Sequence, residues 1–299
     1  IPDHGAGWVE RMGGMDDLIT GAELRSLLDE GADLRILDVR YRLGFTDGHE
    51  NYLGGHLPGA VFADLEAELA GHGAPSDGRH PLPSDEGLEQ AARRWGIRQG
   101  QSVVVYDDSR SLPASRAWWA LRRAGIADVR VLDGGLGAWR EAGGAVEQGE
   151  VVPPLGDVVL SRPGTADVLG TAEVADWTGV LLDARAPERF RGETEPIDPV
   201  AGHIPGARNL PIVDLLTADG RFRSPSEIVA AFEAVGAGEE VPIAAYCGSG
   251  VTAAQLALAG SLIGREVTVY PGSWSAWSNT PGRPIEVGPV PQEADPLED

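Results

Sequence analysis

The sequence contains no lysine, and all 24 of its basic residues are arginine. Without lysine the chain cannot form a Schiff base, bind pyridoxal phosphate through an imine or supply the lysine of a phosphate-binding P-loop. These enzyme classes are therefore excluded.

Cysteine is almost as scarce, since Cys247 is the only one. A lone cysteine can form neither an internal disulfide nor a multi-cysteine zinc site, and the six histidines never stand as a closely spaced ligand pair. We expect neither a metal nor a cofactor. A single cysteine is more often a small buried side chain than a nucleophile, so its neighbours must decide its role.

Long apolar runs are also missing. No stretch approaches the roughly 20 residues that cross a bilayer, and the first residues lack the basic-then-apolar order of a secretion signal. This pattern predicts a cytoplasmic protein without membrane contact. The formal net charge of −22 repels phosphate backbones and argues against nucleic acid as a partner. Residues 1–14 precede the first helix signal and are left out of the interpretation.

The chain repeats itself once. Four segments return in the same order in the second half of the sequence: 37–40 at 182–185, 55–60 at 202–207, 103–106 at 243–246, and 131–139 at 269–277. The second pair reads GHLPGA and GHIPGA. Two copies of one fold are the simplest explanation, and 299 residues suffice for two domains of ordinary size.

Each copy alternates helices and strands. Thr20 and Glu23 form a capping box that opens a helix. Residues 34–39, 103–106 and 129–132 are β-rich runs with a helical stretch between the last two, and the second copy has strands at 243–246 and 267–270 around a helix over 252–263. We predict an α/β fold of two tandem domains, each a mostly parallel sheet flanked by helices. We place the domains at 15–148 and 165–288, a Pro- and Gly-containing linker at 149–164, and an acidic tail at 289–299.

The loop after the strand 243–246 carries the candidate chemistry. Cys247 opens it, Gly248, Ser249, Gly250, Val251 and Thr252 follow, and the loop leads directly into a helix. Alternate glycines let successive N–H groups point at one spot, and the helix dipole adds positive potential there. We therefore expect Cys247 to be an ionised, exposed nucleophile, and the same N–H groups to hold an anionic leaving group.

This loop resembles the active-site loop of 3-mercaptopyruvate sulfurtransferases in the rhodanese family. The resemblance extends over nearly the whole chain, through the repeated motifs, Arg189-Phe190-Arg191-Gly192 and Gly272-Ser273-Trp274. It implies that Cys247 takes a sulfane sulfur from a small anionic donor, 3-mercaptopyruvate or thiosulfate, as a persulfide. A thiol, cyanide or thioredoxin-like acceptor then collects the sulfur. The position that matches Cys247 in the first copy is Asp107, so the first domain is expected to be non-catalytic.

The resemblance also implies roles for other residues. Arg189 matches the arginine that binds the donor's anionic group. Asp64 and His80 match residues that 3-mercaptopyruvate enzymes direct at the loop serine, so Asp64, His80 and Ser249 would form a proton relay. A second arginine, usual several residues after the first, is missing from 195–199, so Arg191, Arg208 or a first-domain arginine would have to replace it. The absence of basic residues in the loop favours 3-mercaptopyruvate, with a thiosulfate-preferring enzyme as the alternative.

Other interpretations were weighed. A phosphatase or arsenate reductase would need an arginine where Ala253 stands, and too little chain follows the loop for a dinucleotide-binding fold. A non-catalytic sulfur-binding module remains a further alternative. We expect His56 and His203 to be scaffold hydrogen-bonders, Asp38 and Asp183 to pair with nearby arginines, and the tryptophans Trp118, Trp119, Trp274 and Trp277 to fill cores or the domain interface.

Overall fold

The computed structural model describes residues 17–161 and 168–289. Residues 1–14, the end of the predicted linker and nearly all of the predicted acidic tail therefore lie outside the described ranges. The domain limits proposed above stay a prediction.

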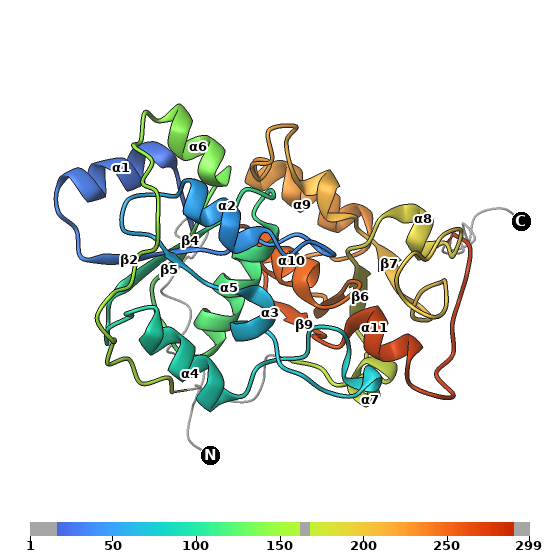
Figure 1. Ribbon diagram of the computed structural model, residues 1–299. Coiled ribbons are helices and arrows are strands. Elements are labelled where there is room, and N and C mark those ends of the chain that lie inside the picture. Colours follow the sequence, from blue (N-terminus) through green and yellow to red (C-terminus); the bar gives the residue numbers. More distant parts are fainter. Residues whose placement is uncertain (1–16, 162–167, 290–299) are drawn as a thin grey trace, which may run out of the picture.

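Two parallel sheets organise the chain (Figure 1). The first has the strand order β1-β5-β4-β2-β3, and its strands are β1 (Leu18–Ile19), β2 (Leu34–Asp38), β3 (Val61–Phe62), β4 (Ser102–Tyr106) and β5 (Val129–Leu132). The second has the order β7-β6-β8-β9, and its strands are β6 (Val180–Asp183), β7 (Arg208–Asn209), β8 (Ile243–Tyr246) and β9 (Val267–Val269). Every strand pair in both sheets is parallel. The predicted α/β fold with two copies is confirmed.

Helices flank both sheets. Those of the first half are α1 (Gly21–Asp29), α2 (Gly48–Gly54), α3 (Leu65–Glu68), the 3-10 helix η1 (Pro75–Asp77), α4 (Asp85–Arg94), α5 (Leu112–Arg123) and α6 (Gly135–Glu141). Those of the second half are α7 (Thr171–Ala175), α8 (Pro187–Phe190), η2 (Ile212–Leu215), α9 (Pro225–Ala234), α10 (Val251–Ser261) and α11 (Ser273–Ser278). We call β1–β5 with their helices the first half, and β6–β9 with theirs the second half.

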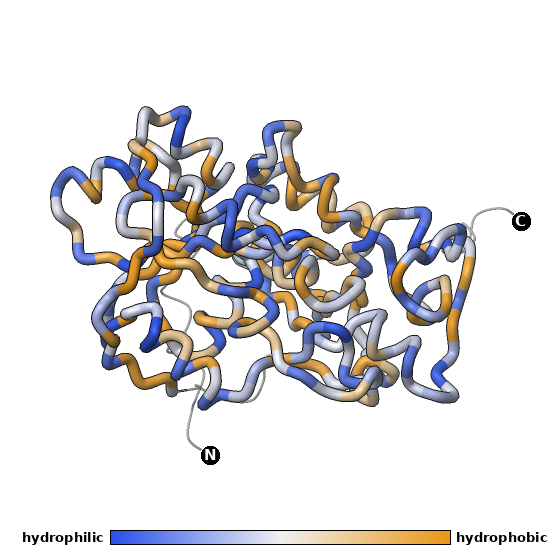
Figure 2. The backbone as a smooth tube through the Cα atoms, in the orientation of Figure 1, coloured by the Kyte–Doolittle hydropathy of each residue, from blue (hydrophilic) through white to orange (hydrophobic). Residues whose placement is uncertain are grey.

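Local sequence explains why these elements form. The predicted capping box at α1 is present, because the Glu23 N–H donates to Thr20 Oγ1 over 3.2 Å and the Thr20 N–H donates to Glu23 Oε2 over 2.9 Å. The central strands β4 and β8 are almost entirely apolar and buried, as strands covered on both faces must be. Figure 2 shows hydrophobic residues running through the central elements of both halves.

The Asp-x-Arg motif of each copy forms a buried ion pair. Arg40 Nη2 lies 2.6 Å from Asp38 Oδ2, and Arg185 Nη2 lies 2.6 Å from Asp183 Oδ2. Each arginine also donates over 2.7 Å to a backbone carbonyl of the following loop. The pairing expected from the sequence is confirmed, and it ties each strand end to the loop beside it.

The repeated histidines belong to the same scaffold. The ring nitrogens of His56 lie 2.8 and 2.9 Å from the carbonyl oxygens of Leu57 and Gly149. Nδ1 of His203 lies 2.8 Å from the carbonyl oxygen of Phe190. Both histidines therefore bind backbone, as expected.

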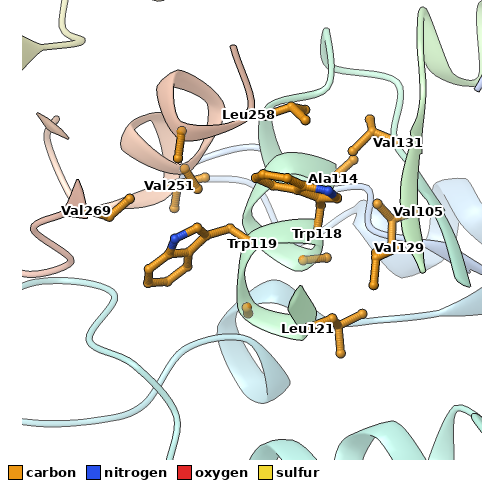
Figure 3. Close-up of a cluster of buried hydrophobic side chains, with 14 of the residues drawn as sticks. Val105, Ala114, Trp118, Trp119, Leu121, Val129, Val131, Val251, Leu258 and Val269 are labelled. Atoms are coloured by element: carbon orange, nitrogen blue, oxygen red, sulfur yellow. The ribbon is translucent and has the colours of Figure 1, made fainter. Parts of the chain in front are cut away.

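The two halves meet where α5 packs against α10 (Figure 1). One apolar core runs through both halves at this contact, and Figure 3 shows Trp118 and Trp119 of α5 near Val251 and Leu258 of α10. Trp274 and Trp277 fill a second core. This packing brings the N-terminal ends of the two helices, and the loops before them, to the interface. No helix in the described part of the chain is long and apolar enough to cross a membrane.

Candidate active site

Cys247 stands between the end of β8 and the start of α10. Its Sγ accepts a hydrogen bond from the Gly250 N–H at 3.1 Å. Gly250 has φ of +80°, and a Cβ built there would lie 2.4 Å from the carbonyl oxygen of Pro271. Only glycine therefore lets the loop turn so tightly that this N–H points at the sulfur.

The expectation of an exposed thiol is wrong, because Cys247 is only 2% exposed. The start of α11 covers the loop: the Trp274 N–H donates to the Cys247 carbonyl and the Ser275 N–H to the Gly248 carbonyl, both at 2.9 Å. Gly248, Ser249 and Gly250 are buried as well. This burial depends on a backbone contact between distant segments, which the local motif does not encode.

Polar groups around the sulfur distinguish it from a thiol packed only among apolar side chains. The Ser273 hydroxyl lies 3.9 Å from Cys247 Sγ and accepts the Cys247 N–H at 3.1 Å. Ser273 holds φ of +53°, a strained value for a residue other than glycine, and the matching residue of the first half is Gly135. Sequence reasoning noted Ser273 within a motif but assigned it no role, although the serine-for-glycine difference between the copies was a usable signal.

Two arginines from different halves frame the loop at Gly248. A Cβ built on Gly248 would lie 3.4 Å from Nη2 of Arg79 and 3.5 Å from Nη1 of Arg189. Their side chains are 23% and 18% exposed. Arg189 was predicted to bind the donor, and Arg79 is the first-domain arginine that lies beside it. Arg191 instead pairs with Glu193 at the surface.

Acidic side chains hold these arginines in place. Arg79 Nη1 donates to Asp198 over 2.8 Å, and Arg189 binds Glu195 through Nε and Nη2 at 3.2 and 2.6 Å. Burial opposes ionisation of Glu195, but hydrogen bonds from Arg189 and the backbone outweigh it, so its pKa is lowered. Within residues 17–161 and 168–289, Arg79 Nη2 and Arg189 Nη1 donate to no protein acceptor. These nitrogens are also the ones nearest the loop.

His80 and Ser249 are brought together across the two halves. Nδ1 of His80 lies 2.8 Å from Oγ of Ser249. Burial lowers the pKa of His80 to about 4, and the charges of Arg116 and Arg79 act in the same direction. The imidazole is therefore neutral at pH 7 and can exchange a proton with the serine hydroxyl.

Asp64 is not joined to His80. Its carboxylate accepts the N–H groups of Glu66 and Ala67 at 2.9 and 3.0 Å as the N-cap of α3, and no hydrogen bond links it to His80 in the described chain. Near Nε2 of His80 lie instead the Tyr41 hydroxyl, at 3.4 Å, and Glu66 Oε1, at 3.8 Å. The Asp64 carboxylate is therefore already bound to the backbone N–H groups at the start of α3. Tyr41 and Glu66 were missed, and no sequence signal marks them.

The remaining predicted loop residues begin the helix. Val251 is the first residue of α10 and is buried, and Thr252 is half-buried in the first turn. Neither side chain hydrogen-bonds to Cys247 within the described chain. Val251 contributes to the core shared by the two halves (Figure 3).

The matching loop of the first half holds a carboxylate in place of the thiol. Asp107 is buried and accepts the N–H groups of Ser109, Ser111 and Ala114 at 2.7, 3.0 and 3.0 Å. Burial raises its pKa to about 6, although these three donors favour the ionised form. This loop is thus a ring of amides around a fixed anion.

The comparisons with known proteins agree with this architecture. The rhodanese-like domain family matches residues 20–142 and 168–280. The chain is 50% identical to the thiosulfate sulfurtransferase SseB of Mycobacterium tuberculosis over 276 residues, which cover 91% of this chain and 97% of that protein. It is 37% identical to the 3-mercaptopyruvate sulfurtransferase of Escherichia coli over 263 residues, which cover 85% of this chain and 92% of that protein.

A solved structure shares the fold over the same length. The crystal structure of SseA from Escherichia coli superposes with a TM-score of 0.77 at 34% identity, over 87% of this chain and 99% of that one. Two domains of this kind, with a thiol loop in the second, define a tandem-domain sulfurtransferase. The chain belongs to the rhodanese family, as the sequence resemblance predicted.

Proposed function

We propose that the protein transfers the thiol sulfur of 3-mercaptopyruvate to Cys247, where it becomes the sulfane sulfur of a persulfide, and then to a thiol, cyanide or thioredoxin-like acceptor. The observation that carries this proposal is the geometry at the loop. Cys247 Sγ accepts the Gly250 N–H, while one terminal nitrogen of Arg79 and one of Arg189, neither with an acceptor in the described part of the chain, lie beside the neighbouring Gly248. A nucleophile and an anion-binding pair thus share one small loop. The cytoplasmic location expected from the sequence stays a prediction.

The Cys247 thiolate attacks the donor sulfur, an S–S bond forms, and the C–S bond of the donor breaks. The electron pair of the C–S bond goes to the leaving carbon, which takes up the proton that the donor thiol loses. The products are a persulfide anion on Cys247 and pyruvate, with the total charge unchanged. An acceptor thiolate or cyanide then takes the outer sulfur and restores the thiolate.

His80 and Ser249 are suited to move that proton. Nδ1 of His80 lies 2.8 Å from Oγ of Ser249, which belongs to the loop of Cys247. His80 is neutral at pH 7 because its pKa is about 4. A neutral imidazole can accept the proton from the donor thiol through Ser249 and return it to the leaving carbon. Asp64 has no hydrogen bond to this pair in the described residues, so we assign the relay to His80 and Ser249.

The local charge balance favours a singly charged donor. Three arginines are paired with three carboxylates near the loop: Arg79, Arg185 and Arg189 with Asp183, Glu195 and Asp198. The set is therefore neutral before the donor arrives. The carboxylate of 3-mercaptopyruvate can bind the unpaired N–H groups of Arg79 and Arg189 as a bidentate ligand. Thiosulfate would bring a second negative charge that no further cation at the loop surface matches.

A thiosulfate-preferring enzyme is the second candidate, because the 50% identical relative from Mycobacterium tuberculosis is named a thiosulfate sulfurtransferase. The deciding experiment compares kcat/KM for 3-mercaptopyruvate and thiosulfate with one thiol acceptor. We expect 3-mercaptopyruvate to be the better donor. Equal efficiency, or a preference for thiosulfate, would overturn the donor assignment and leave the persulfide mechanism to be judged by mass spectrometry. The mechanism requires a gain of about 32 Da on Cys247 after incubation with donor alone.

Arg79 gives this proposal a sharper test. Arg79→Gln should raise the KM for 3-mercaptopyruvate about 10- to 100-fold, the effect of losing one charge-assisted hydrogen bond. Arg191→Gln and Arg208→Gln are matched controls, because each removes one of the other arginines considered for this role, and they should leave the KM within about twofold. A normal KM in Arg79→Gln would remove Arg79 from the donor site.

A further inference from the structure

Arg116 is a buried cation on α5 of the first half, and the function proposed above does not use it. Its side chain is 0% exposed. The guanidinium donates to backbone carbonyls: Nη1 lies 3.4 Å from the Gly250 oxygen, Nη2 lies 3.2 Å from the His80 oxygen, and Nε and Nη2 each lie 3.4 Å from the Leu69 oxygen. Its central carbon also lies 5.4 Å from the centre of the Trp119 ring, a cation–π contact within α5. Arg116 therefore touches the segment of His80 in its own half and the loop of Cys247 in the opposite half.

No carboxylate balances this charge. Within residues 17–161 and 168–289, no Asp or Glu oxygen forms an ion pair with Arg116, whereas the other deeply buried arginines, Arg40 and Arg185, each have an aspartate at 2.6 Å. An unpaired buried charge is costly, so a fold that keeps one must compensate for it. Burial lowers the pKa of Arg116 to about 10, the charge of Cys247 acts against this fall, and the charge of Arg123 adds to it.

The mirror position in the second half shows that the charge is not needed for packing. Gln255 of α10 reaches across the interface in the opposite direction, and its Nε2 donates to the Arg110 carbonyl at 2.6 Å. The N-caps of the two helices, Ser111 and Gly250, both have a positive φ, of 61° and 80°, and Arg116 and Gln255 are each the fifth residue after their cap. Thus the neutral side chain of Gln255 contacts the loop of Asp107, whereas the charged side chain of Arg116 contacts the loop of Cys247.

We propose that Arg116 is a positioning residue of the sulfur site. Its guanidinium holds the carbonyl of Gly250, the residue whose N–H reaches Sγ, and its positive charge balances the thiolate of Cys247 and then the persulfide anion. The charge on the cysteine side chain is −1 before and after sulfur transfer, so one fixed cation serves both states. This inference rests on the proposed function in taking Cys247 as the sulfur carrier, and it gives the first domain a direct part in the chemistry.

The other charged and titratable groups near the loop cannot replace Arg116. They are Arg79 and His80 from the segment after η1, and Arg189, Glu195 and Asp198 from α8 and the loop that follows it. Asp183 and Arg185, at the end of β6, pair with each other. Arg79 and Arg189 are paired with carboxylates, and His80 is neutral at pH 7. Arg116 is therefore the one full positive charge in this set that lacks a carboxylate partner among the described residues.

The test is the pH dependence of alkylation of Cys247 by iodoacetamide, which only the thiolate attacks. Arg116→Met should move the midpoint of the rate profile upward by about 1 to 2 pH units and slow alkylation at pH 7 about 10-fold or more. Arg116→Lys keeps the charge and should recover at least half of the shift. Gln255→Met, the matched change at the mirror position, should leave the midpoint unchanged. An unchanged midpoint in folded Arg116→Met, or equal shifts in the Met and Lys variants, would overturn the inference.

A second measurement keeps Arg116 and removes the anion, in case Arg116→Met does not fold. Thermal unfolding of the wild type and of Cys247→Ala is compared across pH. The wild type should gain stability over Cys247→Ala as the thiolate forms, and a difference independent of pH would contradict the pairing.

The two proposals fail separately. A shifted alkylation midpoint without the gain of about 32 Da would disprove sulfur transfer and leave the role of Arg116 intact. The gain in mass with an unshifted midpoint would disprove the role of Arg116 alone.

Discussion

The loops after β4 and after β8 stand at the same place in two copies of one fold, and they hold different side chains, a carboxyl group and a thiol. In the first, the Asp107 carboxylate accepts three backbone N–H groups. In the second, Cys247 Sγ accepts one, from Gly250. A carboxylate oxygen stands two bonds from Cβ, as the outer sulfur of a cysteine persulfide does. The first loop therefore shows how such a ring of amides surrounds an anion at the distance that a persulfide would reach.

The difference between the loops teaches that the ring of amides alone does not make a site. The second loop has a hydroxyl beside the sulfur, from Ser273 where the first half has Gly135, and it is contacted by a cation, Arg116 of the first half, whereas the first loop is contacted by the neutral Gln255 of the second half. Arg189 also lies beside the second loop. The shared fold supplies the backbone N–H groups, and the polar and charged groups around the second loop come from both halves.

The largest effect should come from replacing the side chain that opens each loop, Cys247 in the second half and Asp107 in the first. Cys247→Ser should lower sulfur transfer from either donor by at least about 10³-fold, because an alcohol at this place is not ionised at neutral pH. Asp107→Ser, the matched change in the first loop, should keep most of the turnover once its folded fraction is counted. Steady-state assays at matched folded concentration measure both, and full activity in Cys247→Ser would disprove the mechanism.

The relay should matter for one donor only. His80→Gln or Ser249→Ala should slow 3-mercaptopyruvate turnover on the order of 10²-fold, since its leaving carbon needs a proton. Thiosulfate releases sulfite by breaking an S–S bond, needs no such proton, and should be affected much less. The ratio of the two kcat/KM values is the readout, and equal losses on both donors would count against the relay.

The Asp107 carboxylate of the first loop should stabilise the folded protein. Asp107→Asn replaces one acceptor oxygen by an N–H₂ group, so at least one of the three amides loses its partner. Urea unfolding at pH 7 should show a loss of about 1 to 3 kcal/mol. Asp108→Asn, at the exposed neighbouring residue, is the control and should change stability by less than about 0.5 kcal/mol. A loss no larger than that of the control would show that the ring of amides does not depend on the carboxylate.

Two titrating groups of the first half, His80 and Asp107, should affect stability with opposite signs as the pH falls. The folded pKa of His80 is about 4, below its ordinary value of 6.5, so the unfolded chain binds the proton first and stability is lost as pH falls through this window. The folded pKa of Asp107 is about 6, above its ordinary 3.8, so the folded chain binds the proton first and stability is gained over this range. Between pH 7 and 5 we expect a loss of about 2 kcal/mol from His80 and a gain of about 1 kcal/mol from Asp107.

Variants separate these two contributions. Urea unfolding of His80→Gln should be less sensitive to acid than that of the wild type, and unfolding of Asp107→Asn should be more sensitive. The same slope in all three proteins would show that neither group titrates differently in the folded and unfolded chains.

The sequence by itself determined the features that depend on neighbours along the chain. The capping box at Thr20, the buried Asp-x-Arg pairs and the glycine turn at Gly250 are each set by a few consecutive residues, whose hydrogen bonds close locally. The repeated motifs predicted two parallel α/β domains for the same reason, since each copy carries its own full pattern. Family resemblance then pointed to Cys247 as the sulfur carrier.

Only the tertiary structure decided what surrounds that sulfur. The contact of His80 with Ser249 spans 169 residues of sequence, and that of Arg116 with Gly250 spans 134. The contact of Arg116 forms because α5 packs on α10, and His80 follows η1, which packs on α11. No local sequence pattern encodes either partner. The contact of α11 with the loop accompanies the burial of the thiol, which the loop motif alone predicted to be exposed.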